Sequence, residues 1–348
     1  MYVIAGPCSA ESPEQILETA GALHEIGIDV FRAGVWKPRT HPGCFEGYGA
    51  KALPWLNQVQ KRFGMKVCCE VAGAKHVEQC LEAGIDMLWI GARTTSNPFL
   101  VQEIADALSG TEVPVMVKNP INPDLGLWIG AFERLSGRGI SNLSAIHRGV
   151  SSRRQEKYRN DPAWDMAIEF RSSFPEIPLY CDPSHMGGAV RYVHELSQKA
   201  LDMGFDGLMI ETHCCPERAL SDAAQQLTPA QLDDLLNGDG KLTVRDNDSE
   251  DESYRRKIAI LREKIDAIDE NLVSLLADRM EVSRQIGAIK RDNNIAIIQP
   301  ARWDEVLSGM TKEGRSFGLQ EEFVRSVFAQ IHKESISVQD NLPKENLD

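Results

Sequence analysis

The chain has 348 residues, which is enough for about two domains. It carries 51 acidic and 38 basic residues, a net charge of −13, which argues against nucleic acid or an anionic membrane as a partner. Apolar residues make up 42% of the chain, which excludes bulk disorder. No apolar run approaches the roughly 20 residues of a membrane helix, and no basic segment starts a secretory signal. Eight cysteines without a Cys-x-x-Cys pair favour a reducing, cytoplasmic location.

Short β-rich runs alternate with amphipathic helix patterns from residue 1 to about residue 237. Most runs are continuously apolar, as expected for parallel strands buried on both faces. Eight such units in this length favour a closed (β/α)8 TIM barrel. The alternative, an open doubly wound sheet, would want a Gly-x-Gly-x-x-Gly turn after the first strand, where the chain has Gly6-Pro7-Cys8-Ser9. The runs are 2–5, 30–33, 67–71, 87–90, 113–117, 143–146, 178–181 and 207–210.

The last third of the chain follows a different pattern. Residues 238–254 are rich in helix breakers and then acidic, which predicts a flexible linker. In the domain expected over 255–348, apolar residues recur at steps of three and four from Ile258 to Ile289. They predict a helix of about 38 residues, about 57 Å long. So small a domain cannot cover that length, so we expect a partner helix from a second chain. Two shorter helices are expected near 299–313 and 320–340.

Basic residues follow the predicted strands at the points where the strands end. In a barrel these loops build the active site, so we expect the cations to converge on one mouth. Scattered surface charge is the alternative, and the position of each residue at a strand end argues against it. Such a rim suits phosphates and a carboxylate. The residues are Arg32, Lys37, Arg39, Arg93, Lys118 and Arg148.

Four potential metal ligands also follow strands that adjoin in a closed barrel. Cys8 follows the first strand, His185 the seventh, and Glu211 and Asp222 belong to the eighth strand and its loop. A mixed sulfur, nitrogen and oxygen set suits a divalent transition ion. By spacing alone, a buried thiol beside helix-capping carboxylates explains the same residues equally well.

Five motifs in this half resemble the type I 3-deoxy-D-arabino-heptulosonate-7-phosphate (DAHP) synthases. They are residues 5–12, 37–40, 91–93, 181–185 and 211–213, and the resemblance spans residues 1–237. These enzymes condense phosphoenolpyruvate with erythrose 4-phosphate. The 3-deoxy-manno-octulosonate 8-phosphate synthases share the barrel, but they typically carry an Asn-containing sequence where this chain has residues 37–40. The continuation at residues 41–47 departs from the familiar one, next to the segment expected to grip the aldose.

The resemblance implies roles for the residues at the barrel mouth. One divalent ion, such as Mn, Co, Fe or Zn, would be held by Cys8, His185, Glu211 and Asp222. Phosphoenolpyruvate would be held by Arg93, Lys118 and Arg148, with Arg32 and Lys37 nearby. Lys118 or a metal-bound water would supply the proton to the new alkoxide. Erythrose 4-phosphate would be gripped by Lys37, Pro38, Arg39 and Thr40.

The long helix carries cations on its apolar face. Arg279 takes a core position four residues after Leu275, and Lys290 lies three turns further on the same face. Arg262 lies about 100° around the helix and faces elsewhere. In the last helix Ser335 and Gln339 border the apolar face. From these residues alone, a dimerisation module with solvent-reaching cations is as good an interpretation as a binding site.

Residues 255–342 resemble the all-helical chorismate mutases in residue type and spacing. The resemblance implies a homodimer whose sites need no metal or other cofactor and convert chorismate to prephenate by positioning and electrostatics. Lys290 and Gln339 would donate to the ether oxygen, and Gln299 stands where many relatives carry an acidic residue. Each site would take Arg262 from the other chain, and Arg279, Lys290, Gln299, Arg302, Ser335 and Gln339 from its own.

The whole chain therefore resembles a bifunctional fusion of the two enzymes in aromatic amino acid biosynthesis. We expect the helical domain also to sense pathway ligands, prephenate among them, and to change synthase activity. The alternative is an octulosonate-type barrel joined to a catalytically silent dimerisation or sensor module. The sequence leaves open whether the barrels also pair to form tetramers.

Overall fold

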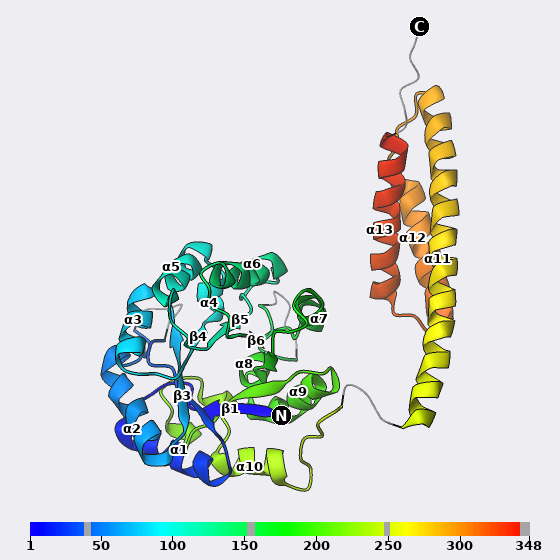
Figure 1. The fold of residues 1–348 in the computed structure, drawn as a ribbon. Helices are drawn as coiled ribbons and strands as arrows, with labels where there is room; N and C mark the ends of the chain where they lie inside the picture. Colours follow the sequence, from blue (N-terminus) through cyan, green and yellow to red (C-terminus); the bar gives the residue numbers. More distant parts are fainter. Residues whose placement is uncertain (38–42, 152–156, 247–250, 342–348) are drawn as a thin grey trace. The chain divides into compact units, whose positions relative to one another are not determined.

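A computed structural model describes residues 1–37, 43–151, 157–246 and 251–341. The chain forms two compact units, Met1–Asn247 and Asp248–Asp348. The first is a ring of parallel strands surrounded by helices, and the second consists of helices alone (Figure 1).

The eight predicted strands form a closed barrel in chain order. Neighbours pair in parallel throughout, and β1 closes the ring on β8, with Ile4 opposite Met209. The expected TIM barrel is therefore confirmed. The strands are β1 (Tyr2–Gly6), β2 (Val30–Arg32), β3 (Lys66–Val71), β4 (Met87–Ile90), β5 (Val115–Lys118), β6 (Leu143–His147), β7 (Leu179–Cys181) and β8 (Gly207–Glu211).

Helices follow the strands and cover the outside of the barrel (Figure 1). They are α1 (Pro13–Glu25), α2 (Leu53–Phe63), α3 (Ala74–Glu82), α4 (Ala92–Thr95), α5 (Pro98–Leu108), α6 (Leu125–Ser136), α7 (Trp164–Ser173), α8 (Pro183–Gly187), α9 (Val193–Asp202) and α10 (Pro229–Asn237). Short 3-10 turns lie in the connections: η1 (Gly49–Ala52), η2 (Val190–Tyr192), η3 (Pro216–Arg218) and η4 (Ala223–Gln225).

Alternation along the strands separates two apolar cores. Side chains such as Ile4, Trp89 and Met209 fill the interior of the barrel. Their neighbours Ala5, Leu88 and Leu208 face outward and pack against the helices. Because both faces of the strands are covered, most of them read as continuous apolar runs in the sequence.

The barrel unit extends beyond the expected boundary at residue 237. Leu242 is buried against Leu235 of α10, and Thr243 and Gln198 of α9 exchange hydrogen bonds. Arg245 pairs with Asp202 at 2.8 Å. The first part of the expected linker, 238–254, is thus attached to the barrel, and its last residues begin the next helix.

The second unit is a three-helix arrangement. It contains α11 (Glu252–Asp292), α12 (Pro300–Ser316) and α13 (Glu321–Asp340), close to the three predicted helices. α13 runs along part of α11 (Figure 1). The apolar residues from Ile260 to Leu275 of α11 remain exposed. In the part of the chain that the structure describes, no helix has the length and apolarity needed to span a membrane.

Candidate active sites

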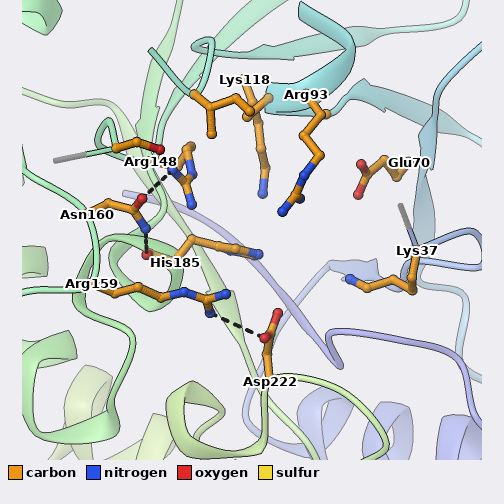
Figure 2. A pocket seen from close by; sticks show the side chains of 13 residues that line it. Lys37, Glu70, Arg93, Lys118, Arg148, Arg159, Asn160, His185 and Asp222 are labelled. Atoms are coloured by element: carbon orange, nitrogen blue, oxygen red, sulfur yellow. Dashed lines mark hydrogen bonds and ion pairs between the residues drawn. The ribbon is translucent and has the colours of Figure 1, made fainter. Parts of the chain in front are cut away.

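A basic pocket of about 260 Å³ opens at the carboxyl ends of the barrel strands. Figure 2 shows Arg93 of α4, Lys118 at the end of β5 and Arg148 just after β6 pointing into it. Lys37, Glu70, His185 and Asp222 also line the pocket. Gly91 leaves room for the Glu70 side chain, because a Cβ at position 91 would lie 2.0 Å from a Glu70 carboxylate oxygen. The convergence of cations predicted from the strand ends is therefore present.

Lys118 is held by a buried carboxylate. Its Nζ lies 2.6 Å from Oδ2 of Asp182, and the same oxygen lies 2.8 Å from Nδ1 of His185. Asp182 also caps α8, since its Oδ1 accepts the backbone N–H of His185. Burial acts to raise the pKa of Asp182, but the charges of His185 and Lys118 outweigh it and hold the pKa well below its usual range. One carboxylate thus orients both an ammonium and an imidazole.

Arg32 lies beneath the pocket instead of lining it. Its guanidinium is 1% exposed, donates to Glu211 at 3.1 Å and to the Cys8 carbonyl at 3.2 Å, and stacks over Trp89 at 4.8 Å. Lys118 Nζ lies 5.8 Å from the centre of the same indole. The indole forms a floor under both cations, so Arg32 contributes charge and orientation from below.

Three of the four expected metal ligands gather beside this floor. One ligand atom each from Cys8, Glu211 and Asp222 lies within 4.8 Å of the others. His185 lies outside that set, although its Nε2 is 3.6 Å from Glu211. Position 6, two residues before Cys8, requires glycine, because a Cβ there would lie 2.1 Å from the carbonyl oxygen of Arg32.

The chemistry of this donor set fits a divalent cation. Burial, followed by the charge of Glu211, raises the pKa of the Cys8 thiol to about 12, so a thiolate here needs strong positive charge beside it. Burial also acts to raise the pKa of Asp222, but His185 and Arg159 outweigh it and lower the pKa to about 2. Two ionised carboxylates, a thiol and an imidazole suit a transition ion.

Arg159 and Asn160 are among the pocket residues that sequence reasoning missed. Arg159 reaches Asp222 at 3.3 Å, and Asn160 bridges Arg148 and the backbone of His185 (Figure 2). Both belong to the irregular connection between β6 and α7, where no periodic pattern marks a side chain as inward-facing. The predicted aldose-binding residues Pro38, Arg39 and Thr40 lie outside the described residues, whereas Lys37 lines the pocket and contacts the Cys8 thiol at 3.0 Å.

The helical unit contains a separate cavity of about 580 Å³. Arg279 donates to Ser335 at 2.5 Å, and Lys290 donates to the carbonyl of Ile297 at 2.7 Å. The amide nitrogen of Gln339 donates to the backbone of Ser335, while its oxygen is buried without a partner among the described residues. The predicted residues that line this cavity are Arg279, Lys290, Gln299, Arg302, Ser335 and Gln339.

The lining of this cavity has two further features. Trp303 and His332 stack with ring centres 4.1 Å apart and form an aromatic wall that sequence reasoning missed. Among the residues described, no Asp or Glu lines the cavity. Arg262 is exposed on α11 and does not line it, so its contribution to the site of a second chain stays a prediction. The cavity is therefore suited to a ring that carries carboxylates.

A closed parallel barrel with a basic pocket at the carboxyl ends of its strands has the architecture of a (β/α)8 enzyme. The chain belongs to the DAHP synthetase I family, whose model matches residues 1–245. Residues 261–340 match the model for chorismate mutase type II. The chain thus joins a domain of a transferase family to a domain of an isomerase family.

Curated relatives and solved structures agree with the barrel assignment. A phospho-2-dehydro-3-deoxyheptonate aldolase of Thermotoga maritima is 33% identical over 65% of this chain and 64% of its own length. A 2-dehydro-3-deoxyphosphooctonate aldolase of Bradyrhizobium is 29% identical over 68% of this chain and 85% of its own. The crystal structure of a Thermotoga maritima DAHP synthase gives a TM-score of 0.60 at 31% identity, over 68% of this chain and 66% of that one. The chain thus spans less than two thirds of either Thermotoga protein.

Proposed function

We propose that the barrel condenses phosphoenolpyruvate with erythrose 4-phosphate to form DAHP and phosphate. The observation that carries this proposal is the placement of Arg93, Lys118 and Arg148 around one pocket, beside the cluster of Cys8, Glu211 and Asp222. Three cations match the charges of a phosphate ester and its carboxylate. Membership of the DAHP synthetase I family supports the same reaction.

The residues of the barrel pocket would serve different parts of this reaction. The three cations hold phosphoenolpyruvate so that its C3 attacks the aldehyde carbon of the second substrate, after which water adds to C2 and phosphate leaves. Lys118, paired with Asp182 at 2.6 Å, is placed to give a proton to the new alkoxide. Lys37, with residues 38–40, is the proposed grip on the aldose phosphate.

We also propose that Cys8, His185, Glu211 and Asp222 hold one divalent ion. When bound, such an ion supplies Lewis-acid polarisation of a carbonyl oxygen. Arg32 supports the site from below, because its guanidinium donates to Glu211 while Gln225 donates to the other oxygen of that carboxylate at 2.6 Å. The orientation of Glu211 is therefore fixed by two neighbours.

The choice of aldose tests the synthase proposal. Several relatives are octonate aldolases, so the alternative is a longer five-carbon acceptor. The purified chain is incubated with phosphoenolpyruvate and either erythrose 4-phosphate or arabinose 5-phosphate, and phosphate release is measured. We expect release with erythrose 4-phosphate at a rate at least tenfold above that with arabinose 5-phosphate, a difference of about 1.4 kcal/mol in barrier. The reverse preference would support the octulosonate-type reaction, and no release with either would exclude both.

For the helical unit we propose conversion of chorismate to prephenate. Arg279, Arg302 and Arg262 of a second chain would bind the two carboxylates, and Lys290 and Gln339 would donate to the ether oxygen as negative charge develops there. With its amide as placed, Gln339 presents its oxygen, so donation requires the amide to rotate by half a turn. Gln299 and the aromatic wall would face the remainder of the chorismate ring.

The alternative for this unit is a silent sensor or dimerisation module. Arg279→Ala separates the two, because loss of a charged donor to the substrate should lower kcat/KM for chorismate by about 10² or more. Arg284→Ala is the matched control, since Arg284 pairs with Glu281 on the surface and does not line the cavity. Absence of mutase turnover in the unaltered chain would favour the silent module.

We propose that the unit forms a homodimer through α11. Its apolar side chains at Leu261, Ile265, Ile268 and Leu272 are each more than half exposed, an arrangement that a second long helix would cover. The same pairing would bring Arg262 of one chain to the cavity of the other.

We propose in addition that a ligand of the helical unit changes synthase activity. The support is the fusion itself, because the two reactions are not consecutive and simple transfer of a product does not explain it. Synthase kinetics are measured with and without prephenate or chorismate, and unchanged kinetics would exclude the idea.

The eight cysteines, all free, support a reducing location such as the cytoplasm.

A further inference from the structure

Asn160 is a buried amide with a fixed partner at each end. It lies between β6 and α7 and is 6% exposed. Its Oδ1 accepts a hydrogen bond from Nη1 of Arg148 at 2.9 Å, and its Nδ2 donates to the backbone oxygen of His185 at 2.7 Å. Figure 2 shows these two bonds side by side at the edge of the pocket. The amide therefore joins an anion-binding arginine to the segment that carries the imidazole.

Among the described residues, every hydrogen-bond partner of Arg148 is a neutral group. Its side chain also donates to the carbonyl of Gly149 at 3.4 Å, and its backbone N–H donates to Oδ1 of Asn119 at 2.7 Å. Within the described ranges, no carboxylate lies within ion-pair distance of this guanidinium. Lys118, by contrast, is paired with Asp182. A neutral acceptor orients a guanidinium without cancelling its charge, so the full charge remains for a ligand.

The other end of Asn160 is anchored to α8. Besides the side-chain bond to His185, the backbone N–H of Asn160 donates to the carbonyl of Met186 at 3.1 Å, and that of Arg159 donates to Gly187 at 3.3 Å. These bonds satisfy carbonyls in the last turn of a short helix, which otherwise lack partners. The position of Asn160 is thus tied to the helix that presents the His185 ring toward Glu211.

We propose that Asn160 is a positioning residue that aims the charge of Arg148 at the phosphoenolpyruvate anion and fixes it relative to His185. The inference rests on the proposed synthase function and adds to it a requirement for a neutral amide at this position. A carboxylate of the same shape would pair with Arg148 and oppose the carbonyl of His185. An apolar side chain would leave the charge of Arg148 intact, but it would remove the acceptor that orients the guanidinium.

The test compares two variants that differ in charge and volume. Asn160→Asp keeps the volume and adds a charge, whereas Asn160→Ala removes the amide. Asn142→Asp, at an exposed position before β6, is the control for net charge. Binding of phosphoenolpyruvate, and separately of inorganic phosphate, is measured by titration calorimetry on the full chain. KM and kcat are measured with erythrose 4-phosphate, and circular dichroism checks folding.

The order of the effects distinguishes positioning from a structural role. We expect Asn160→Asp to weaken phosphoenolpyruvate binding by about 10- to 100-fold, as for loss of hydrogen bonding to a charged group, with KM rising more than kcat falls. We expect Asn160→Ala to weaken it less, and Asn142→Asp to leave it within about twofold, as for distant surface charges. A merely structural role predicts the opposite order, because alanine leaves a cavity.

Three results would overturn the proposal. The first is an Asn160→Asp variant that binds both anions as the unaltered chain does. The second is an Asn160→Ala variant with the weaker binding of the two. The third is failure of Asn160→Asp to fold, because the guanidinium 2.9 Å away should stabilise the carboxylate. If the unaltered chain binds phosphate but neither binds nor consumes phosphoenolpyruvate, the synthase proposal fails, while the phosphate titrations still test Asn160.

Discussion

His147 and Arg148 are neighbours in the chain with opposite surroundings. Arg148 enters the basic pocket, whereas the ring of His147 lies in the helix layer near Trp128, Trp164 and Phe205. Its Nε2 donates to the carbonyl of Pro162 at 2.5 Å. Burial lowers the pKa of His147 to about 4, so the folded state favours the neutral ring.

This histidine should make the barrel sensitive to acid. An unfolded histidine has a pKa of about 6.5, so the unfolded state binds more protons below that pH and stability falls as the pH drops toward 4. The expected loss is about 3 kcal/mol over that range. His147→Gln keeps a donor but does not titrate, and it should lose correspondingly less. Urea unfolding followed by tryptophan fluorescence at pH 7 and pH 4.5 measures the difference. Equal acid sensitivity in both proteins would contradict the neutral buried ring.

The Cys8 thiol should be essential for the proposed metal site. Cys8→Ser removes the soft ligand, so affinity for a divalent transition ion should fall by about tenfold or more. Synthase activity should fall with it, and mutase activity should not change. Cys215→Ser is the control, since Cys215 is partly exposed and lies outside the cluster. Undiminished metal binding by Cys8→Ser would remove the thiol from the proposed site.

Residues at strand ends were predictable from the sequence, whereas residues in irregular connections were not. Lys118 and Arg148 adjoin apolar strands, so barrel geometry alone directs them to one mouth. Asn160 and Arg159 reach the same pocket through a connection whose path depends on hydrogen bonds to α8. The depth of Arg32 depends on packing against Trp89 and Glu211, which strand order does not specify.

Close packing of α12 on α13 depends on one glycine. A Cβ at Gly314 would lie 2.6 Å from a methyl group of Val324, which is itself buried. Gly309, in the same helix, has nothing within 4 Å of its Cβ position and is exposed. Substitutions at the two positions therefore distinguish the effect of helix propensity on stability from the effect of packing.

Alanine substitution at these glycines should have opposite effects. Gly314→Ala should destabilise the helical unit by about 1–3 kcal/mol through overpacking. Gly309→Ala should stabilise it by up to about 1 kcal/mol, because alanine favours the helix. Scanning calorimetry of the full chain measures both shifts. Stabilisation by both substitutions would show that α12 and α13 are not packed as described.

The exposed face of α11 predicts an effect on assembly. Ile268→Glu places a charge on a side chain that is 58% exposed in the single chain, so it should disrupt pairing without unfolding the helix. Glu270→Ala, on the opposite side of α11, is the control. Light scattering should report half the mass for Ile268→Glu and an unchanged mass for the control. An unchanged mass for Ile268→Glu would move the interface elsewhere.

Elements were predicted more accurately than their ends. Mostly apolar runs located all eight strands, because burial on both faces leaves few polar interruptions. Hydrophobic spacing located α11 but not its full 41 residues, since its first turns carry charged residues. The stretch from 238 was expected to be a free linker because of its composition, yet Leu242 packs on α10.

At the scale of the whole molecule, two sites with different requirements lie in separate compact units. The barrel pocket combines cations with a thiol, an imidazole and two carboxylates, a set suited to metal-assisted chemistry. The cavity of the helical unit is lined by cations, amides and an aromatic wall, with no carboxylate among its described lining residues. The two proposed activities should therefore respond differently to removal of divalent ions.

One paired assay on the full chain tests this account most directly. Phosphate release from phosphoenolpyruvate with erythrose 4-phosphate, and loss of chorismate, are measured in the same preparation before and after treatment with EDTA. We expect EDTA to abolish phosphate release, added Mn²⁺ to restore it, and chorismate turnover to stay constant throughout. Phosphate release that persists in EDTA, or chorismate turnover that is lost with it, would contradict the account.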